Sequence, residues 1–148
     1  MQKTLYILLS LVLLVTSSLA EETFLSLKKN KVNVFNFKLD KKKFEKIIKN
    51  YDYVVDGTDN FTAKFLINDL SLKYKKFLVT GAISKFDGHI FTFNFNDKKK
   101  PCLRCFYQEE AISDDILSCE YEGILGTVAG IIGTMQANEV LKKILKKL

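Results

Sequence analysis

The sequence lacks the residues on which several common active sites depend. It has one histidine and three cysteines among its 148 residues. A Ser-His-Asp arrangement therefore has no support, and the zinc signal is weak because a closed site usually needs a second cysteine pair, which this sequence lacks. An odd number of cysteines, two of them spaced C-x-x-C, makes a poor disulfide framework and a better metal or redox signal.

The chain also lacks the glycine motifs of nucleotide-binding loops. No P-loop is present, and the glycines at 126, 130 and 133 neither form G-x-G-x-x-G nor follow a clear strand. A dinucleotide loop is therefore not predicted there. We expect a helix from about Gly123 to Leu148, in which these glycines thin one side so that it can lie close to a sheet or another helix.

Charge of one sign is scattered along the chain and does not form a patch. The formal net charge is +6, and the lysines occur in short runs throughout. Aromatic residues do not interleave with these runs, as a stacking platform for nucleic acid requires. Such runs are usually solvated faces or helix ends, so no nucleic-acid partner is expected.

The first 20 residues stand apart from the rest. Lys3 precedes an apolar run over residues 5–15, and a small-residue segment ends at Ala20. This pattern is typical of a secretory signal peptide, and the run is short for a bilayer span of roughly 20 residues. The alternative is an accidental apolar start. We therefore divide the chain into a signal-peptide-like segment, 1–20, and one domain, 21–148.

Strand and helix patterns alternate within the domain. The expected strands are 32–37, 53–55 and 77–79, and the expected helices are 41–49 and 61–74. This alternation predicts an α/β fold with parallel strands and crossover helices. Asp87-Gly88 predicts a hairpin turn, because both turn positions need positive φ, so the sheet is expected to be partly antiparallel. Residues 96–118 are expected to form an irregular loop.

Acidic residues follow the strand at 53–55. In an open α/β sheet, ligands bind just beyond the carboxyl ends of strands, which places Asp56 and Asp59 at a candidate site. A carboxylate at a helix N-terminus repels phosphate directly but can hold a Mg²⁺ that bridges to phosphate. The alternative is that Asp59 or Asn60 simply caps the following helix.

The cysteines give weaker signals. Cys102 and Cys105 have the spacing of half a zinc knuckle, and the lone His89 is expected to be solvated near a turn. Cys119 is either a nucleophile or an inert structural thiol. Its acidic sequence neighbours disfavour the thiolate, and no cation close in sequence activates it.

Five segments of the chain together resemble a known family. They are YDYVVDGTDNFTAKFLIN (51–68), VTGA (79–82), DG (87–88), PCLRC (101–105) and CEYEGILGTVAGIIGTMQANEVLK (119–142). In this order and spacing they resemble the E1-like adenylyltransferases, the ThiF/MoeB/HesA group related to ubiquitin-activating enzymes. The resemblance covers about residues 25–148 and implies a truncated, Rossmann-like E1/ThiF-type fold with a C-terminal helix.

The resemblance also implies an activity. Enzymes of this group use ATP and Mg²⁺ to adenylate the C-terminal glycine carboxylate of a small ubiquitin-like sulfur-carrier protein. By motif position, Asp59 matches the acid that contacts Mg²⁺ and the ATP phosphates, with Asp56 and Asn60 beside it. Lys64 stands where the group usually has arginine, which removes a bidentate donor fork.

The cysteines also match motif positions of this group. Cys102 and Cys105 match the first half of its zinc site. Cys119 matches a cysteine that can take part in thioester or sulfur transfer.

The chain departs from the group in two ways. The glycine-rich strand-turn-helix that cradles ATP does not precede residue 25, and the second C-x-x-C pair is missing. We therefore expect an incomplete or inactive adenylyltransferase, unless a second polypeptide supplies the missing half.

Other interpretations remain open. One is a non-catalytic subunit that binds a homologous chain, as a homo-oligomer or complementing subunit, or a ubiquitin-like partner. Another is an exported α/β protein. ATP and the carrier are cytosolic, which favours a cytoplasmic location.

Overall fold

A computed structural model describes residues 4–7, 33–96, 101–107 and 123–145. In these ranges the chain forms four strands and four helices. The strands are β1 (Thr4–Ile7), β2 (Tyr53–Asp56), β3 (Phe77–Ser84) and β4 (Asp87–Asn94). The helices are α2 (Lys41–Ile48), α3 (Phe61–Lys73), α4 (Leu103–Phe106) and α6 (Gly126–Leu145).

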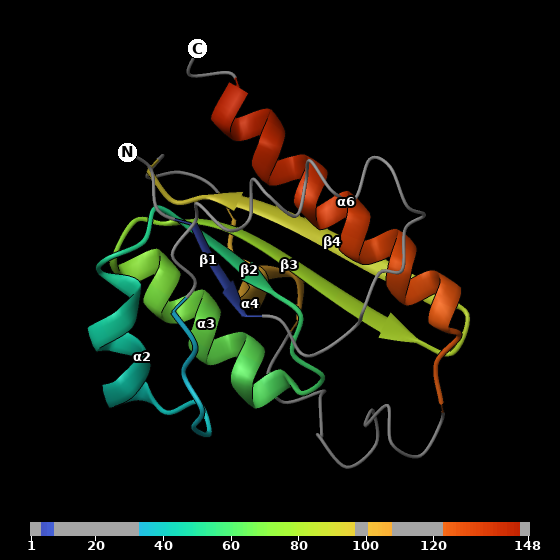
Figure 1. Ribbon diagram of the computed structural model, residues 1–148, viewed down its shortest axis with the longest axis horizontal. Coiled ribbons are helices and arrows are strands. Elements are labelled where there is room, and N and C mark those ends of the chain that lie inside the picture. The colour runs from blue at the N-terminus through green and yellow to red at the C-terminus, as the bar shows by residue number, and fades with distance from the viewer. Residues whose placement is uncertain (1–3, 8–32, 97–100, 108–122, 146–148) are drawn as a thin grey trace.

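The strands form one mixed sheet in the order β1-β2-β3-β4 (Figure 1). β1, β2 and β3 are parallel, and β4 is antiparallel to β3. The unit β2-α3-β3 is a parallel crossover, because two parallel neighbours need a long connection, whereas the crossover expected from 32–37 through the helix at 41–49 to β2 does not form, since 33–37 is no strand. The α/β fold with parallel strands and an antiparallel hairpin is confirmed.

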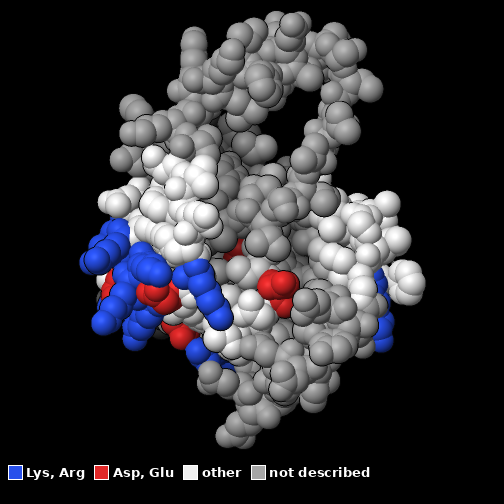
Figure 2. Space-filling view, turned by 60° about the horizontal axis from the view of Figure 1, so that its bottom comes forward, with Lys and Arg blue, Asp and Glu red and all other residues white. Residues whose placement is uncertain are grey.

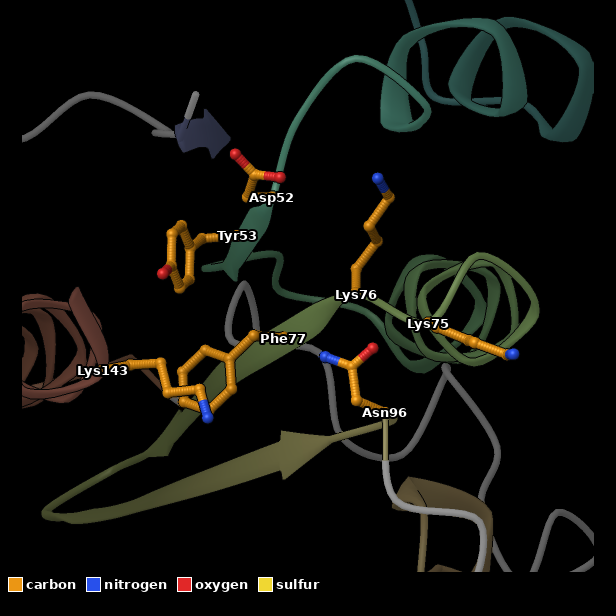
Figure 3. Close-up of a pocket in the computed structure, with 7 residues that line it drawn as sticks. All are labelled: Asp52, Tyr53, Lys75, Lys76, Phe77, Asn96 and Lys143. Atoms are coloured by element: carbon orange, nitrogen blue, oxygen red, sulfur yellow. The ribbon is translucent and has the colours of Figure 1, made fainter. Parts of the chain in front are cut away.

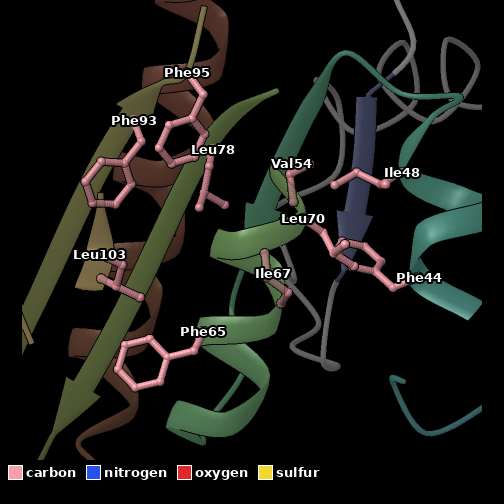
Figure 4. Packing of buried hydrophobic residues seen from close by; sticks show 10 residues of the cluster. All are labelled: Phe44, Ile48, Val54, Phe65, Ile67, Leu70, Leu78, Phe93, Phe95 and Leu103. Atoms are coloured by element: carbon pink, nitrogen blue, oxygen red, sulfur yellow. The ribbon is translucent and has the colours of Figure 1, made fainter. Parts of the chain in front are cut away.

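Helices cover both faces of the sheet. Successive side chains of a strand point to opposite faces, so Val54 and Leu78 join the apolar core beneath α2 and α3 (Figure 4). Tyr53 and Val79 point the other way and pack with Val140 of α6. α6 lies against β3 and β4. Among the described residues, no helix is both long enough and apolar enough to cross a membrane.

Side-chain caps fix the starts of α2 and α3. The carboxylate of Asp40 accepts a hydrogen bond from Lys43 N at 2.8 Å, and the amide oxygen of Asn60 accepts one from Ala63 N at 2.8 Å. Each cap satisfies a backbone donor that the first helical turn leaves open, a contribution of about 0.5–2 kcal/mol. Both predicted helices are confirmed, and Asn60, rather than Asp59, caps α3.

The predicted strand at 32–37 is wrong over its described part. Residues 33–37 have no strand conformation, and the side chains of Val34 and Phe35 are 85% and 46% exposed. β-branched and aromatic content favours a strand only where one face is buried, and in this segment only Phe37 is partly buried. The neighbour of β2 is instead β1, from the segment interpreted as signal-like. The signal peptide itself stays a prediction.

The hairpin forms, but its turn lies two residues earlier than predicted. Ser84 pairs with Asp87, which leaves Lys85 and Phe86 as the loop, and Lys85 takes the positive φ of 51°. Gly88 lies within β4, where a Cβ would come within 2.6 Å of Ile132 Cγ1. The glycine is therefore used for close approach of α6 and not for the turn.

The same contact corrects the expectation for the helix glycines. A Cβ added at Gly126, Gly130 or Gly133 would meet no atom within 4 Å among the described residues. The helix does lie close to the sheet, but the space comes from Gly81 and Gly88 on the strands. A glycine on a strand leaves room for a bulky side chain of the helix, here Gln136 or Ile132, without small residues on the helix itself.

Candidate functional site

The two acidic residues of the predicted site have different environments. Asp56 is the last residue of β2, and strand alternation points its side chain to the α3 face, where it is fully buried. Asp59 lies three residues later, just before the α3 cap, and is exposed. Of the two carboxylates in this motif, that of Asp56 is buried inside the protein and that of Asp59 is exposed at the surface.

Asp56 is the centre of a buried polar network. Its Oδ1 accepts hydrogen bonds from Thr58 N at 2.8 Å and Thr58 Oγ1 at 2.7 Å. Its Oδ2 accepts from Lys64 Nζ at 3.2 Å and from Thr80 Oγ1. Both oxygens are engaged within the protein, so this carboxylate organises the turn and does not present itself to a ligand.

Lys64, which stands where the related group usually has arginine, lies inside the protein. Its side chain is only 5% exposed, and Nζ donates to Asp56 Oδ2 and to the carbonyl oxygen of Gly81. Breaking a buried pair of this kind by removing one partner typically costs about 3–5 kcal/mol, because the other charge remains buried. The helical spacing from the Asn60 cap turns Lys64 toward the sheet.

Gln136 of α6 reaches the same point from the opposite face of the sheet. Its Nε2 donates to the carbonyl oxygen of Asp56 at 2.7 Å and to that of Val79 at 3.4 Å. Sequence reasoning missed Gln136 and Thr80 as members of the site. Both are polar residues within apolar segments, and a buried polar group needs a hydrogen-bonding partner. That pattern was the signal in the sequence that could have pointed to them.

Asp59 and Asn60 form the outer edge of the site. Asn60 uses its amide oxygen as the α3 cap, and its Nδ2 donates to Asp59 Oδ1 at 3.2 Å. An exposed carboxylate at this edge suits a Mg²⁺ ion, which keeps several waters and takes one or two carboxylates together with phosphate oxygens. The residues present therefore fit the Mg²⁺ side of a nucleotide site.

The cysteine pair lies at the start of α4, within the segment predicted to be irregular. The Sγ atoms of Cys102 and Cys105 are 3.8 Å apart, and both thiols are free. Two sulfurs bound to one tetrahedral zinc at about 2.3 Å are separated by roughly 3.8 Å, so the pair fits half of a zinc site. Among the described residues, no group of three or more His, Cys, Asp or Glu side chains converges. Cys119 lies outside the described residues.

The cysteine segment docks on the helix that follows the acidic turn. Leu103 N donates to Asn68 Oδ1 at 3.0 Å, and the Arg104 guanidinium holds both oxygens of Asp69 at 2.9 Å. The same guanidinium lies 4.5 Å from the ring centroid of Phe65. One helix, α3, therefore carries the site turn at its start and anchors the cysteine pair in its middle.

A small pocket of about 200 Å³ lies at the opposite edge of the sheet (Figure 3). Tyr53 and Phe77, which line it, begin β2 and β3, whereas Asp59 follows the end of β2. The other lining residues are Asp52, Lys75, Lys76, Asn96 and Lys143. Three lysines against one aspartate make this pocket basic, and it is separate from the acidic turn.

Surface charge is unevenly spread. On the face shown in Figure 2, Lys and Arg side chains gather mainly at one flank, with acidic side chains among them. Among the described residues, exposed opposite charges pair directly, as Lys43 does with Asp40 and Lys73 with Glu45. Lysines paired in this way are ordinary solvated side chains, and such exposed pairs contribute little to stability.

Comparison with known protein families identifies the family of this chain. The sequence profile of the ThiF family matches residues 17–148. This chain belongs to the ThiF family. The acidic turn, the cysteine pair and α6 of the ThiF-family chain all fall within the matched residues.

Curated relatives carry names that describe an activity. The chain is 38% identical over 112 residues to "Adenylyltransferase and sulfurtransferase MOCS3" of Dictyostelium discoideum, covering 76% of this chain and 26% of that protein. It is 39% identical over 115 residues to "Probable molybdopterin-synthase adenylyltransferase" of Porphyra purpurea, covering 77% and 30%. The chain thus spans between a quarter and a third of the length of these relatives.

Proposed function

We propose that this chain takes part in adenylyl transfer from ATP to the C-terminal carboxylate of a small sulfur-carrier protein. Membership of the ThiF family and the names of its relatives support the reaction class. The observation that carries the proposal for this chain is the exposed Asp59 carboxylate at the carboxyl end of β2. This is the edge where open α/β sheets bind ligands.

In the proposed reaction, a carboxylate oxygen of the carrier attacks the α-phosphorus of ATP. A new P–O bond forms, the bond from the α-phosphorus to the bridging oxygen breaks, and pyrophosphate leaves. A bound Mg²⁺ would supply charge neutralisation for the phosphates. Asp59 would hold that ion, and Asn60 keeps the Asp59 side chain oriented through its hydrogen bond. Asp56 and Lys64 stay outside the reaction because each engages the other.

We extend the proposal to zinc at the cysteine pair. Cys102 and Cys105 would supply two thiolate ligands, and the separation of their sulfurs supports this. Zinc there would hold α4 and its segment in place and would take no part in the transfer. We also propose a cytoplasmic location, where ATP is available.

Exchange of labelled pyrophosphate into ATP tests the activity. The full chain is assayed with Mg²⁺ and a carrier protein that ends in Gly-Gly, beside the same carrier without its last glycine. Because the glycine-rich ATP loop was not found in this sequence, we expect little exchange from the chain alone. Adding a ThiF-family polypeptide that carries this loop should give exchange that requires both Mg²⁺ and the intact carrier. A folded chain that gives no exchange even with this second polypeptide would contradict the proposal and favour a non-catalytic interaction subunit.

A further inference from the structure

We propose that Lys64 is a positioning residue, which fixes the acidic turn through Asp56 and thereby sets where Asp59 is presented. The proposal goes beyond the sequence analysis, which noted only that Lys64 stands where the group usually has arginine. It rests on the proposed function only for the part that concerns nucleotide affinity.

The connection runs through the two oxygens of one carboxylate. Lys64 Nζ and Thr80 Oγ1 bind Oδ2, which leaves Oδ1 to accept both donors of Thr58. Thr58 lies one residue before Asp59, so the orientation of the Asp56 carboxyl group determines the path of the turn. A buried carboxylate without its cation would lose that fixed orientation.

Lys64 is itself fixed from a second side. Its Nζ also donates to the Gly81 carbonyl on β3, and the side chain has almost no exposed surface. Gln136 holds the Asp56 backbone carbonyl from the other face of the sheet. The end of β2 is thus held by α3, β3 and α6 together, while Asp59 stays exposed beyond it.

The variant Lys64→Met removes the ammonium and keeps an unbranched side chain, and Lys64→Arg restores the charge. Arg104→Met is the matched control, because it removes a cation from an ion pair with Asp69 of the same helix, away from the turn. Two readouts are measured on the folded full chain. They are hydrogen exchange of the Thr58 amide by NMR, relative to core amides such as that of Val54, and the Kd for ATP with Mg²⁺.

For Lys64→Met we expect exchange of the Thr58 amide to speed up about tenfold relative to core amides, because a charge-assisted network is lost. The Kd for ATP with Mg²⁺ rises by a similar factor. Lys64→Arg recovers most of both effects, whereas Arg104→Met lowers the melting temperature without changing either readout. A folded Lys64→Met chain with unchanged Thr58 exchange would overturn the proposal.

The experiment also covers two other outcomes, a wild-type chain that does not bind ATP and a Lys64→Met variant that does not fold. If the wild-type chain does not bind ATP with Mg²⁺, the proposed function fails, and the Thr58 amide still decides the positioning role. If Lys64→Met does not fold, Thr80→Val removes a neutral donor from the same Oδ2 atom. It should also speed Thr58 exchange, and an unchanged rate in that variant would overturn the proposal.

Discussion

At the scale of single residues, two strand glycines set how closely α6 approaches the sheet. A Cβ on Gly88 would lie 2.6 Å from Ile132 Cγ1, and one on Gly81 would lie 2.9 Å from Gln136 Cδ. Both distances are shorter than carbon atoms tolerate without movement. The close approach of α6 therefore depends on the absence of a Cβ at both positions, and the contact of Gln136 with the Asp56 carbonyl depends on it at Gly81.

We expect Gly88→Ala to lower the free energy of unfolding by about 1–3 kcal/mol, because the added methyl group overpacks a fixed helix–sheet contact. Gly133→Ala is the control, since its Cβ would meet no described atom and alanine favours a helix interior by roughly 0.5–1 kcal/mol. Urea unfolding of both variants measures the difference. Equal destabilisation by the two substitutions would contradict the assignment of close approach to the strand glycine.

Single residues also show where sequence reasoning stops. Asp59 and Asn60 could be placed at a helix start beside a strand end, because caps and strand ends have local signals. The burial of Lys64 could not be derived, since it depends on Asp56 and Gly81 meeting across two different strands. The Asp87-Gly88 pair predicted that Gly88 lies in the turn, whereas in the structure Gly88 lies in β4 and makes room for Ile132 of α6.

At the scale of elements, α2 and α3 are joined by a carboxylate on their facing sides. Lys73 and, at 2.6 Å, the Tyr74 hydroxyl donate to Glu45 Oε1. These two donors, Lys73 first, hold the pKa of Glu45 at about 2, below its usual 4.5. In return, the hydrogen bond to Glu45 raises the pKa of Lys73.

The stability supplied by Glu45 should therefore depend on pH in a defined direction. A carboxyl group with a lowered folded pKa stabilises fully above its unfolded pKa of 4.5 and loses this contribution as pH falls to about 2. We expect Glu45→Gln to melt at a lower temperature than wild type at pH 7, with the gap closing between pH 4.5 and 2. The gap is small because the pair is partly exposed. A gap that stays constant over that range would contradict the assignment.

Element boundaries followed the sequence where a local signal and burial agreed. α2 and α3 were expected from helical periodicity and caps, α6 from the glycine-spaced segment that begins at Gly123, and β2 and β3 from short buried apolar runs. The segment 33–37 has strand composition, but only Phe37 in it is partly buried. The short helix α4 was missed because four residues are too few for a periodic pattern, and it is fixed by Asn68 and Asp69 of α3.

At the scale of the whole molecule, the sheet uses residues that the sequence assigned to a cleavable segment. All four residues of β1 pair with β2, in the register Thr4 with Tyr53 through Ile7 with Asp56. Cleavage after Ala20 would remove this edge strand and expose the backbone of β2, the strand that ends at the site.

We therefore expect the mature protein to keep residues 1–20. The intact mass of the protein purified from its native cell measures this directly, and the cytoplasmic fraction is the control compartment. A mature N-terminus at Glu21 in an extracytoplasmic fraction would contradict both this expectation and the proposed cytoplasmic location.

The central claim is that Asp59 forms the Mg²⁺ side of an ATP site at the carboxyl end of β2. The most direct measurement is calorimetric titration of ATP, with and without Mg²⁺, into the wild-type chain, Asp59→Asn and Asp87→Asn. Asp87 is an exposed acid on the β3-β4 hairpin and serves as the control. We expect Mg²⁺ to tighten ATP binding to the wild type and to Asp87→Asn, and Asp59→Asn to weaken it about tenfold or more, a loss of about 1.4 kcal/mol. Equal, Mg²⁺-dependent affinity in all three folded proteins, or no binding to the wild type, would contradict the claim.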